Sequence, residues 1–369
     1  MAVEVWIETM QPMLTLNGIE RRYGKTVALD GVSFSVGRGA YVSLLGPSGS
    51  GKTTLLRIIA GFERPDAGHV GFDGLRIDDL PAYRRGIGFV FQNFALFPHL
   101  SVRKNISFGL LNREGGASLD RRAIEAKVRD IVALVGLAGL EDRDVHQISG
   151  GQRQRVALAR TLVTQPRLVL LDEPLGALDA NLRARMRDEL RGLHDRLGVT
   201  FLHVTGSEAE ALAMGDTIIV LDRGRIAQAD PADTIYNRPA SPRVARFLNC
   251  YNLFAGVVEG REFVSGAGRF PLDEAGYRVS SASEAAYAIR HDRIAVRAAD
   301  TPLARGEASL SARFVASEYS GASVLSFFTT ASGQVIEVED HLSLREPPAY
   351  AQSQNYALVW KPLDALVFA

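Results

Sequence analysis

Several features that mark other classes of protein are missing from this chain of 369 residues. It has a single cysteine, Cys250, so no disulfide can form within the chain, which fits a reducing compartment. Lysine plus arginine equals aspartate plus glutamate, at 42 each, whereas proteins that neutralise nucleic-acid phosphates carry a basic excess. We therefore predict no nucleic-acid partner. No segment approaches the roughly 18 consecutive apolar residues that span a bilayer.

The amino terminus also lacks a recognisable export signal. Residues 1–13 include Glu4 and Glu8, and they do not form a basic start followed by an apolar run. We therefore expect the chain to act from the water side of any membrane that it serves.

The spacing of apolar residues divides the chain into two parts. Between residues 41 and 221, strands alternate with helices, which predicts a mainly parallel, doubly wound α/β sheet. Residues 14–36 precede it as an antiparallel β segment, and a mainly helical insertion occupies about residues 93–164. Beyond residue 249, short strand-like runs with Gly and Ser turns indicate a small all-β domain, such as a barrel. We place the two domains at residues 13–242 and 243–369.

The residues 46–53, GPSGSGKT, lie between a predicted buried strand and a predicted helix. This is the pattern of a phosphate-binding loop (P-loop), whose glycines let backbone N–H groups surround the phosphates at a helix N-terminus. Lys52 is expected to reach the β- and γ-phosphates, and the Thr53 hydroxyl is expected to bind Mg²⁺.

A second motif supplies carboxylates. The apolar strand at residues 167–171 ends in Asp172 and Glu173, at the strand end where ligands bind in doubly wound folds. Asp172 is expected to help hold Mg²⁺, and Glu173 is expected to act as the general base toward the attacking water.

A third motif provides another anion site. Ser149 is suited to cap a helix over residues 153–163, and Gly150, Gly151 and Gln152 follow it. A helix start with a hydroxyl and glycine amides favours an anion. Since one nucleotide does not need two such sites in one subunit, we predict that two subunits face head to tail and that each Ser149 segment caps the partner's ATP. An ordinary capped surface helix is the alternative.

In type and in order, the three motifs resemble those of the ATP-binding cassette (ABC) ATPases. The resemblance runs from about residue 14 to residue 248, and the 23-residue separation of Ser149 and Asp172 agrees with it. Beyond residue 249 the chain resembles, more weakly, the accessory β domain of importer ATPases, through the stretches 252–254 and 360–362. The resemblance implies a P-loop core followed by an OB-like, TOBE-type C-terminal domain.

The same resemblance implies a function and its partners. An importer ATPase of this family binds ATP and Mg²⁺, hydrolyses ATP as a head-to-tail homodimer, and couples dimer closure to solute uptake through separate transmembrane permease subunits. An extracytoplasmic solute-binding protein takes part indirectly, and the ATPase is peripheral, on the cytoplasmic face of the inner membrane. Residues 61–65 and 91–110 look most like polyamine and ferric-ion importer ATPases, with sulfate, phosphonate, opine and sugar importers as close competitors.

Individual roles follow from the matching positions. Tyr23 resembles the aromatic residue that stacks on adenine, and Gln92 resembles the glutamine that contacts Mg²⁺ or water. Residues 175–179 resemble the loop that crosses the dimer interface. The implied catalytic residues are Lys52, Gln92 and Glu173, and the implied metal ligands are Thr53, Gln92 and Asp172. The implied nucleotide-binding residues are Tyr23, Gly46, Ser48, Gly49, Ser50, Gly51, Lys52, Thr53, Thr54, Ser149, Gly150, Gly151, Gln152 and Asp179.

One position departs from the family pattern. Where Val-Thr-His-Asp is usual, this chain has Val204-Thr205-Gly206-Ser207, so the histidine that would hydrogen-bond the γ-phosphate is missing. Loss of one transition-state donor costs roughly 10²–10³ in rate. His203 lies three residues earlier on a strand and should point elsewhere. Either Glu173 sustains hydrolysis with help from another group or water, or the subunit binds ATP for regulation with little turnover.

A third possibility is a non-transport ABC ATPase. Such proteins usually carry paired cassettes, long coiled-coil insertions or zinc-binding cysteines, and this chain has one cassette and one cysteine.

The stretch 94–100, FALFPHL, is unusually apolar and follows Gln92 closely. It is either part of the core of the helical insertion or an exposed groove for a helix of a transmembrane partner. In the second case, Gln92 would link nucleotide-driven closure to movement of the partner.

Overall fold

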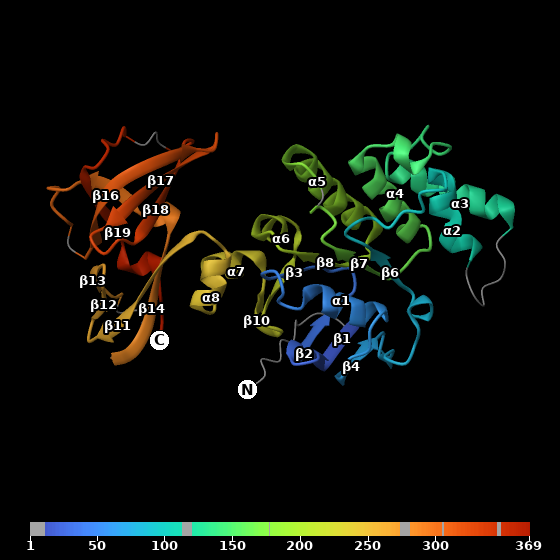
Figure 1. Ribbon diagram of the computed structural model, residues 1–369, viewed down its shortest axis with the longest axis horizontal. Helices are drawn as coiled ribbons and strands as arrows, with labels where there is room; N and C mark the ends of the chain where they lie inside the picture. Colours follow the sequence, from blue (N-terminus) through green and yellow to red (C-terminus); the bar gives the residue numbers. More distant parts are fainter. Residues whose placement is uncertain (1–11, 113–119, 177, 274–280, 305, 345–347) are drawn as a thin grey trace. The chain divides into compact units, whose positions relative to one another are not determined.

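The computed structural model describes residues 12–112, 120–176, 178–273, 281–304, 306–344 and 348–369. The chain forms two compact units, of which the first ends at Asn237 and the second begins at Arg238 (Figure 1). Most of the predicted leaderless amino terminus, and Ala177 of the predicted interface loop, lie outside the described residues. The assignment of functional domains to residues 13–242 and 243–369 stays a prediction.

A six-stranded sheet forms the centre of the first unit. Its order is β10-β9-β3-β8-β7-β6, and every neighbouring pair is parallel except β10 with β9. The doubly wound core predicted from the sequence is therefore confirmed. The strand bounds are β3 Tyr41–Leu45, β6 Ile87–Val90, β7 Leu168–Asp172, β8 Thr200–Thr205, β9 Thr217–Asp222 and β10 Arg225–Asp230.

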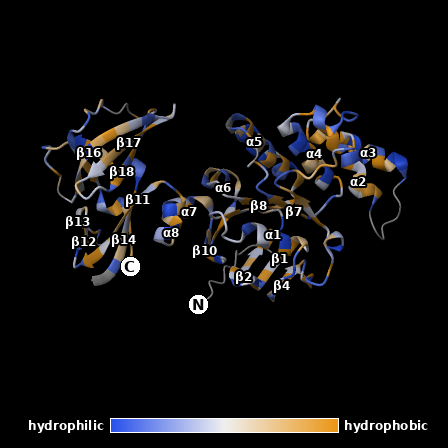
Figure 2. Ribbon diagram, viewed as in Figure 1, coloured by the Kyte–Doolittle hydropathy of each residue, from blue (hydrophilic) through white to orange (hydrophobic). Residues whose placement is uncertain are grey.

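The two faces of this sheet contact different layers. Val169, Leu171 and Phe201 pack into one core with the helical insertion, whereas Leu168, Leu170 and the alternate residues of β8 pack into another core with α1. Because side chains alternate along a strand, a sheet covered on both faces needs continuous apolar runs. Figure 1 shows α4 and α5 on one side of the sheet and α1 on the other, and Figure 2 shows the hydrophobic colouring of β7 and β8 between them.

A second sheet covers α1 (Lys52–Ala60) on its outer side. Its order is β2-β1-β4-β5, all antiparallel, as predicted for residues 14–36. The bounds are β1 Leu14–Tyr23, β2 Thr26–Val36, β4 Ala67–Phe72 and β5 Leu75–Arg76.

Three helices form the insertion: α2 (Val102–Leu111), α3 (Arg121–Leu134) and α4 (Gly150–Leu162). Each begins after a side chain that accepts a hydrogen bond from the first turn, namely Ser101, Asp120 and Ser149. The helix predicted at residues 153–163 therefore starts earlier, directly after its cap. The other helices of this unit are α5 Ala180–Leu197, α6 Glu208–Met214 and α7 Ala232–Asn237.

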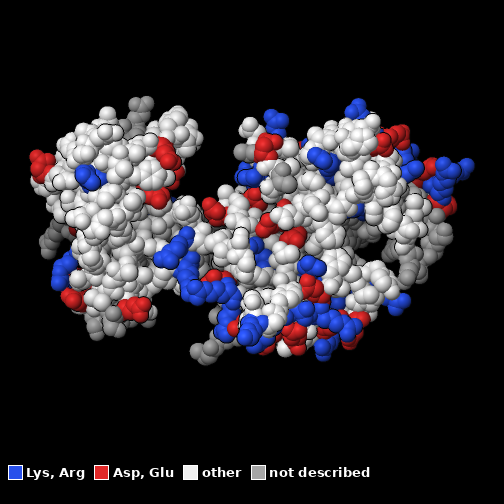
Figure 3. Space-filling model, in the orientation of Figure 1, with Lys and Arg blue, Asp and Glu red and all other residues white. Residues whose placement is uncertain are grey.

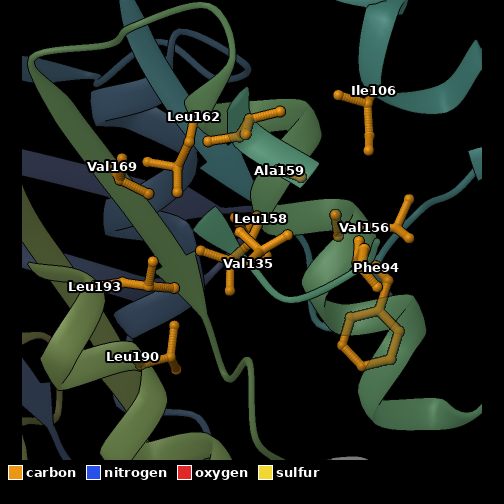
Figure 4. Packing of buried hydrophobic residues seen from close by; sticks show 14 of the residues in the cluster. Phe94, Ile106, Val135, Val156, Leu158, Ala159, Leu162, Val169, Leu190 and Leu193 are labelled. Atoms are coloured by element: carbon orange, nitrogen blue, oxygen red, sulfur yellow. The ribbon is translucent and has the colours of Figure 1, made fainter. Parts of the chain in front are cut away.

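The apolar stretch after Gln92 divides between core and surface. Phe94 is only 8% exposed and belongs to the core of the insertion, where it lies beside Val156 of α4 (Figure 4). The groove interpretation is wrong for Phe94, because this side chain is buried in the core and is not available to a partner helix. Phe97 is half-buried, and its ring centroid lies 4.3 Å from that of Phe108 on α2.

The second unit begins with α8 (Pro242–Phe247), and its remaining elements are mostly strands in two five-stranded antiparallel sheets. An aromatic core fills it, and within that core Trp360 Nε1 donates a 2.7 Å hydrogen bond to the Tyr287 hydroxyl. The predicted all-β character after residue 249 is confirmed and fits a TOBE-like domain. One sheet contains β11 Tyr251–Glu259, β12 Glu262–Ser265, β13 Gly268–Pro271, β14 Ser281–Arg290 and β20 Ala365–Phe368. The other contains β15 Ala295–Ala298, β16 Ala308–Tyr319, β17 Ser323–Thr330, β18 Val335–His341 and β19 Asn355–Trp360.

The C-terminal end of α1 depends on Arg85. This buried guanidinium donates to the carbonyls of Ile58 and Ile59 at 2.8 and 2.9 Å. Its other nitrogens donate to the carbonyls of Asp78 and Leu80. We predict that Arg85→Met lowers the free energy of opening of α1 by about 2–4 kcal/mol, because these carbonyls lose a charged donor.

Hydrogen exchange of the α1 amides measures this effect, since it reports one helix in a chain of two units. The neighbouring exposed Arg84 supplies the control, and Arg84→Met should change opening by less than about 0.5 kcal/mol. Equal exchange in the two variants would show that Arg85 does not stabilise α1.

Candidate functional site

The parallel strand register brings the predicted motifs to one edge of the sheet. Leu45 pairs with Thr205, Val204 pairs with Asp172, and Leu171 pairs with Val90. Four strands therefore end side by side. The residues that follow these ends are Gly46, Gly206, Glu173 and, one position further on, Gln92.

The P-loop backbone requires its glycines. Gly49 and Gly51 have φ of 79° and 104°, which other residues rarely adopt. A Cβ on Gly46 would lie 2.2 Å from the carbonyl oxygen of Leu221, so a side chain there would displace the loop from β9. Ser50 is 2% exposed, and its Oγ has no hydrogen-bond partner among the residues that the structure describes. An orphaned buried hydroxyl inside a glycine-rich loop fits a phosphate oxygen.

Lys52 is held inside this loop. Its Nζ donates to the carbonyls of Gly46 and Pro47 at 2.7 and 3.0 Å. An ammonium group has three N–H donors, so one stays available for a phosphate. Burial lowers the pKa of Lys52, and the carboxylates of Glu173 and Asp172 act in the opposite direction.

Thr53 and Asp172 meet across the sheet edge. Thr53 Oγ1 donates to Asp172 Oδ1 at 3.2 Å. Burial raises the pKa of Asp172, an effect that the Thr53 hydrogen bond opposes, and a bound cation would stabilise the ionised carboxylate. A hydroxyl and a carboxylate are oxygen ligands of the kind that Mg²⁺ prefers. The two residues therefore fit the predicted metal site.

Glu173 lies at the end of β7 in a rare backbone conformation, with φ of 44°. Its N–H donates to the Val204 carbonyl at 3.0 Å, so the neighbouring strand fixes this turn. Gln92 Nε2 donates to Glu173 Oε2 at 2.9 Å. The structure thus brings the predicted base and the predicted glutamine together, and the amide oxygen of Gln92 keeps its acceptor capacity.

The Ser149 segment begins α4 with a capping box. Ser149 Oγ accepts from the Gln152 N–H at 3.3 Å, and Gln152 Oε1 accepts from the Ser149 N–H at 2.8 Å. Among the described residues, no hydrogen bond or ion pair joins this segment to the P-loop of the same chain. Ser149 is exposed, whereas Ile148 before it is buried. The cap therefore faces solvent, and the residue before it is anchored in the core.

Two further predicted residues have defined partners. The Tyr23 side chain is 44% exposed, and its hydroxyl donates to Glu63 Oε2. Asp179 caps α5, where its Oδ1 accepts from the Leu182 N–H at 2.9 Å. The structure does not bring Tyr23 or Asp179 into contact with the sheet-edge residues, and their roles stay predictions.

The space at Gly206, where the family pattern has a histidine, is open. A Cβ on Gly206 would have no atom within 4 Å, and its φ is outside the left-handed range. His203 cannot replace the missing group, because it is fully buried on the α5 face beside Tyr41, and burial lowers its pKa to about 3. The Thr205 hydroxyl is also occupied, since it donates to Glu210 Oε2 at 2.7 Å. Ser207 Oγ accepts from the Glu210 N–H.

Two residues that the sequence analysis missed shape the segment after Gln92. Arg160 of α4 donates to the carbonyls of Phe94 and Ala95 at 2.8 and 2.7 Å. Asn105 is fully buried and donates to the carbonyls of Phe97, Leu100 and Ser101. A signal for Arg160 was present, since it stands in an apolar stretch of the helix with no acidic residue within four positions.

The P-loop, the Thr53–Asp172 pair and the Gln92–Glu173 pair at the edge of a parallel sheet define a P-loop nucleoside-triphosphatase fold and site. Comparison with known proteins identifies the family within this class. The family model described as "ABC transporter" matches residues 29–176. The chain belongs to this family, and it is an ABC-type ATPase.

Named relatives resemble this chain over most of their length. The spermidine/putrescine import ATP-binding protein PotA of Clostridioides difficile is 44% identical over 68% of this chain and 71% of its own. The Fe(3+) ions import ATP-binding protein FbpC of Pasteurella multocida is 45% identical over 71% of this chain and 74% of its own. The sulfate/thiosulfate import ATP-binding protein CysA of Caulobacter vibrioides is 44% identical over 76% and 81%.

Solved structures resemble the first unit. A dimeric post-hydrolysis structure of the ATP-binding cassette MJ0796, bound to ADP and Pi, is 32% identical, with a TM-score of 0.53 over 60% of this chain and 99% of that one. The structure of cbiO1 from Clostridium perfringens, part of the ABC transporter complex cbiONQ, is 29% identical, with a TM-score of 0.56 over 65% and 95%.

The open space at Gly206 leads to a direct test of the missing donor. We predict that Gly206→His raises kcat by about 10- to 100-fold with little change in KM, because it adds a donor that acts mainly in the transition state. Steady-state ATPase assays measure both constants. Gly206→Ala fills the same space without a donor and should leave kcat near that of the parent. Equal kcat in the two variants would mean that the missing histidine does not limit turnover.

Proposed function

We propose that this chain is the ATP-hydrolysing subunit of an ABC importer, which acts with Mg²⁺ as a head-to-tail homodimer. The observation that carries the proposal is the meeting of three pieces at one sheet edge: a P-loop with an orphaned Ser50 hydroxyl, the Thr53–Asp172 pair, and the Gln92–Glu173 pair. Each supplies one requirement of phosphoryl transfer to water.

The residues divide the chemistry among them. The P-loop amides and the free N–H of Lys52 hold the β- and γ-phosphates. Thr53, Asp172 and the Gln92 amide oxygen hold Mg²⁺, which when bound neutralises phosphate charge. Glu173 accepts a proton from the attacking water, and Gln92 keeps the carboxylate at the sheet edge through its 2.9 Å hydrogen bond.

The Ser149 segment completes the site of a second subunit. Its cap residue, Ser149, is exposed, and the segment has no bond to its own P-loop among the described residues, yet its cap geometry is preformed. A preformed helix N-terminus favours a phosphate group. The dimeric cassette bound to ADP and Pi supports assembly of this kind. We infer that Ser149, Gly150 and Gly151 bind the γ-phosphate held by the partner.

Transport follows from coupling to a permease. All three relatives are named import ATP-binding proteins, and no helix in the described part of the chain is both long and apolar enough to cross a membrane. We propose that the ATPase binds peripherally at the cytoplasmic face of the inner membrane to separate transmembrane subunits, with a solute-binding protein on the other side. Figure 3 shows Lys and Arg side chains beside Asp and Glu side chains on the visible face of the first unit.

The solute proposed for this importer is a polyamine, with ferric iron as the second candidate. Relatives named for polyamines, ferric ions and sulfate or thiosulfate differ by one percentage point in identity, so the cassette carries little of the selectivity. Uptake assays with the chain's own permease and each solute decide between them.

Gly206 favours a second candidate function, an ATP-binding regulatory subunit that turns over slowly. The two functions predict different results for one variant, Glu173→Gln. If the chain hydrolyses ATP, Glu173→Gln should lower kcat by about 10²–10⁴-fold because the general base is lost, while Mg·ATP still binds. The same variant should dimerise with ATP, as measured by light scattering.

The control for this experiment is Glu125→Gln, which removes a carboxylate from an exposed ion pair on α3. It should retain parental kcat. Tight Mg·ATP binding with no turnover in the parent, with and without permease, would contradict hydrolysis and support the regulatory function.

The permease surface can be tested separately from the nucleotide site. The ring of Phe97 packs on that of Phe108, and Leu111 follows Phe108 by three residues, on the same side of α2. We call these three residues the apolar patch, in which Phe108 and Leu111 are 38% and 64% exposed. We predict that Phe97→Glu abolishes stimulation of the ATPase by the permease, because a charge replaces the apolar contact. Phe94→Glu is unsuitable, since it buries a charge in the core.

Stimulation is measured as the ratio of ATPase rates with and without the permease in liposomes. Tyr83→Glu, at a 63% exposed aromatic residue outside the patch, is the control. Normal stimulation in the Phe97 variant would contradict docking at this patch.

A further inference from the structure

Glu63 joins the loop after α1 to two other elements, α1 itself and β1. It lies in the loop after α1, and its side chain is only 15% exposed. One carboxylate oxygen accepts from Arg57 of α1 at 2.9 Å. The other accepts from the Tyr23 hydroxyl and lies 3.8 Å from Arg21.

A second set of contacts fixes the same hairpin end. The Arg21 guanidinium lies 5.0 Å from the centroid of the Tyr23 ring, a cation–π distance. It also pairs with Asp66 at 2.8 Å, and the other oxygen of Asp66 accepts from the Arg22 N–H at 2.6 Å. The Asp66 N–H in turn donates to the Glu20 carbonyl. The loop after α1 is thus bonded to the end of β1 at several points.

We propose that Glu63 is a positioning residue, which fixes the Tyr23 ring relative to the P-loop helix so that the ring is ready to stack on the nucleobase. The proposal rests on the function proposed above and on the role that the family resemblance implies for Tyr23, which is to stack on adenine. Glu63 itself touches no nucleotide in this scheme and acts through the Tyr23 hydroxyl.

The physical reason is entropic. Tyr23 lies at the open end of a hairpin and is 44% exposed, so a free ring would sample several rotamers and lose them on binding. Hydrogen bonding at its hydroxyl and the guanidinium beside its ring restrict it before ATP arrives, which improves affinity without a new contact. Because Glu63 also pairs with Arg57 on α1, the ring is tied to the helix whose N-terminus binds the phosphates.

Two probes separate this role from a general structural role. MgATP has a nucleobase, whereas inorganic tripolyphosphate with Mg²⁺ presents only the phosphates. Binding of both is measured by calorimetry on the full chain and four variants: Glu63→Ala, Glu63→Gln, Tyr23→Phe and Glu63→Ala with Tyr23→Phe. Glu125→Gln is the matched control for loss of a carboxylate.

If Glu63 acts through Tyr23, Glu63→Ala weakens MgATP binding by about three- to tenfold and leaves tripolyphosphate binding unchanged. Tyr23→Phe, which keeps the ring but loses the hydroxyl, gives a similar loss, and the double variant is no weaker than either. Glu63→Gln retains an acceptor for the hydroxyl and recovers part of the affinity. In the ATPase assay, KM rises while kcat is maintained.

Three results overturn the proposal. Equal weakening of both probes by Glu63→Ala and Glu63→Gln would show that Glu63 supports the P-loop helix in general. Additive losses in the double variant would show that it does not act through Tyr23. Unchanged MgATP affinity in every variant would show that neither residue serves the nucleobase. A parent that binds neither probe contradicts the proposed function itself, a result distinct from these three.

Discussion

Parallel pairing of β3, β8, β7 and β6 is the constraint on which the site depends. Residues from four distant parts of the chain meet because their strands end in register, with Leu45 opposite Thr205 and Val204 opposite Asp172. A slip of one residue would exchange the two faces of a strand. For β7 such a slip would also move Glu173 away from the Val204 carbonyl that holds its unusual turn. The apolar runs on both faces therefore fix the catalytic geometry as well as the fold.

The loop at Gly206 shows how a site can lose a donor without losing its shape. Glu210 holds the loop through the Thr205 hydroxyl and through its own N–H to Ser207. These bonds involve no side chain at position 206, and the space there is open. The Thr205 hydroxyl spends its only donor on Glu210, so it is not free to take the place of the missing imidazole, whereas Ser207 Oγ serves the loop only as an acceptor. The effect of glycine at this position is thus confined to the chemistry and does not extend to the local fold.

How much could be predicted from the sequence depended mainly on how close together the interacting residues are along the chain. The P-loop is contiguous, so its glycines and the following helix could be inferred directly, and the order of apolar runs was enough for the parallel core. The burial of Phe94 could not be inferred, because the core that it joins includes Val156, more than 60 residues away in the sequence. The roles of Arg160 and Asn105 in binding loop carbonyls were hidden for the same reason. In the second unit, the all-β character was predictable, whereas the pairing order β15-β19-β16 joins residues far apart in the sequence.

The two ends of α4 indicate how a site and a distant surface can move together. Ser149 caps its first turn, and Arg160 near its last turn holds the carbonyls of Phe94 and Ala95. These positions are about 16 Å apart along a helix, and between them Val156 and its neighbours pack into a continuous core (Figure 4). A packed helix transmits a displacement with little internal deformation. In the proposed dimer, a shift of Ser149 toward the partner's phosphate would therefore reach the segment that carries Phe97. Gln92 lies just before that same segment and is bonded to Glu173, so both subunits' nucleotides would act on one surface.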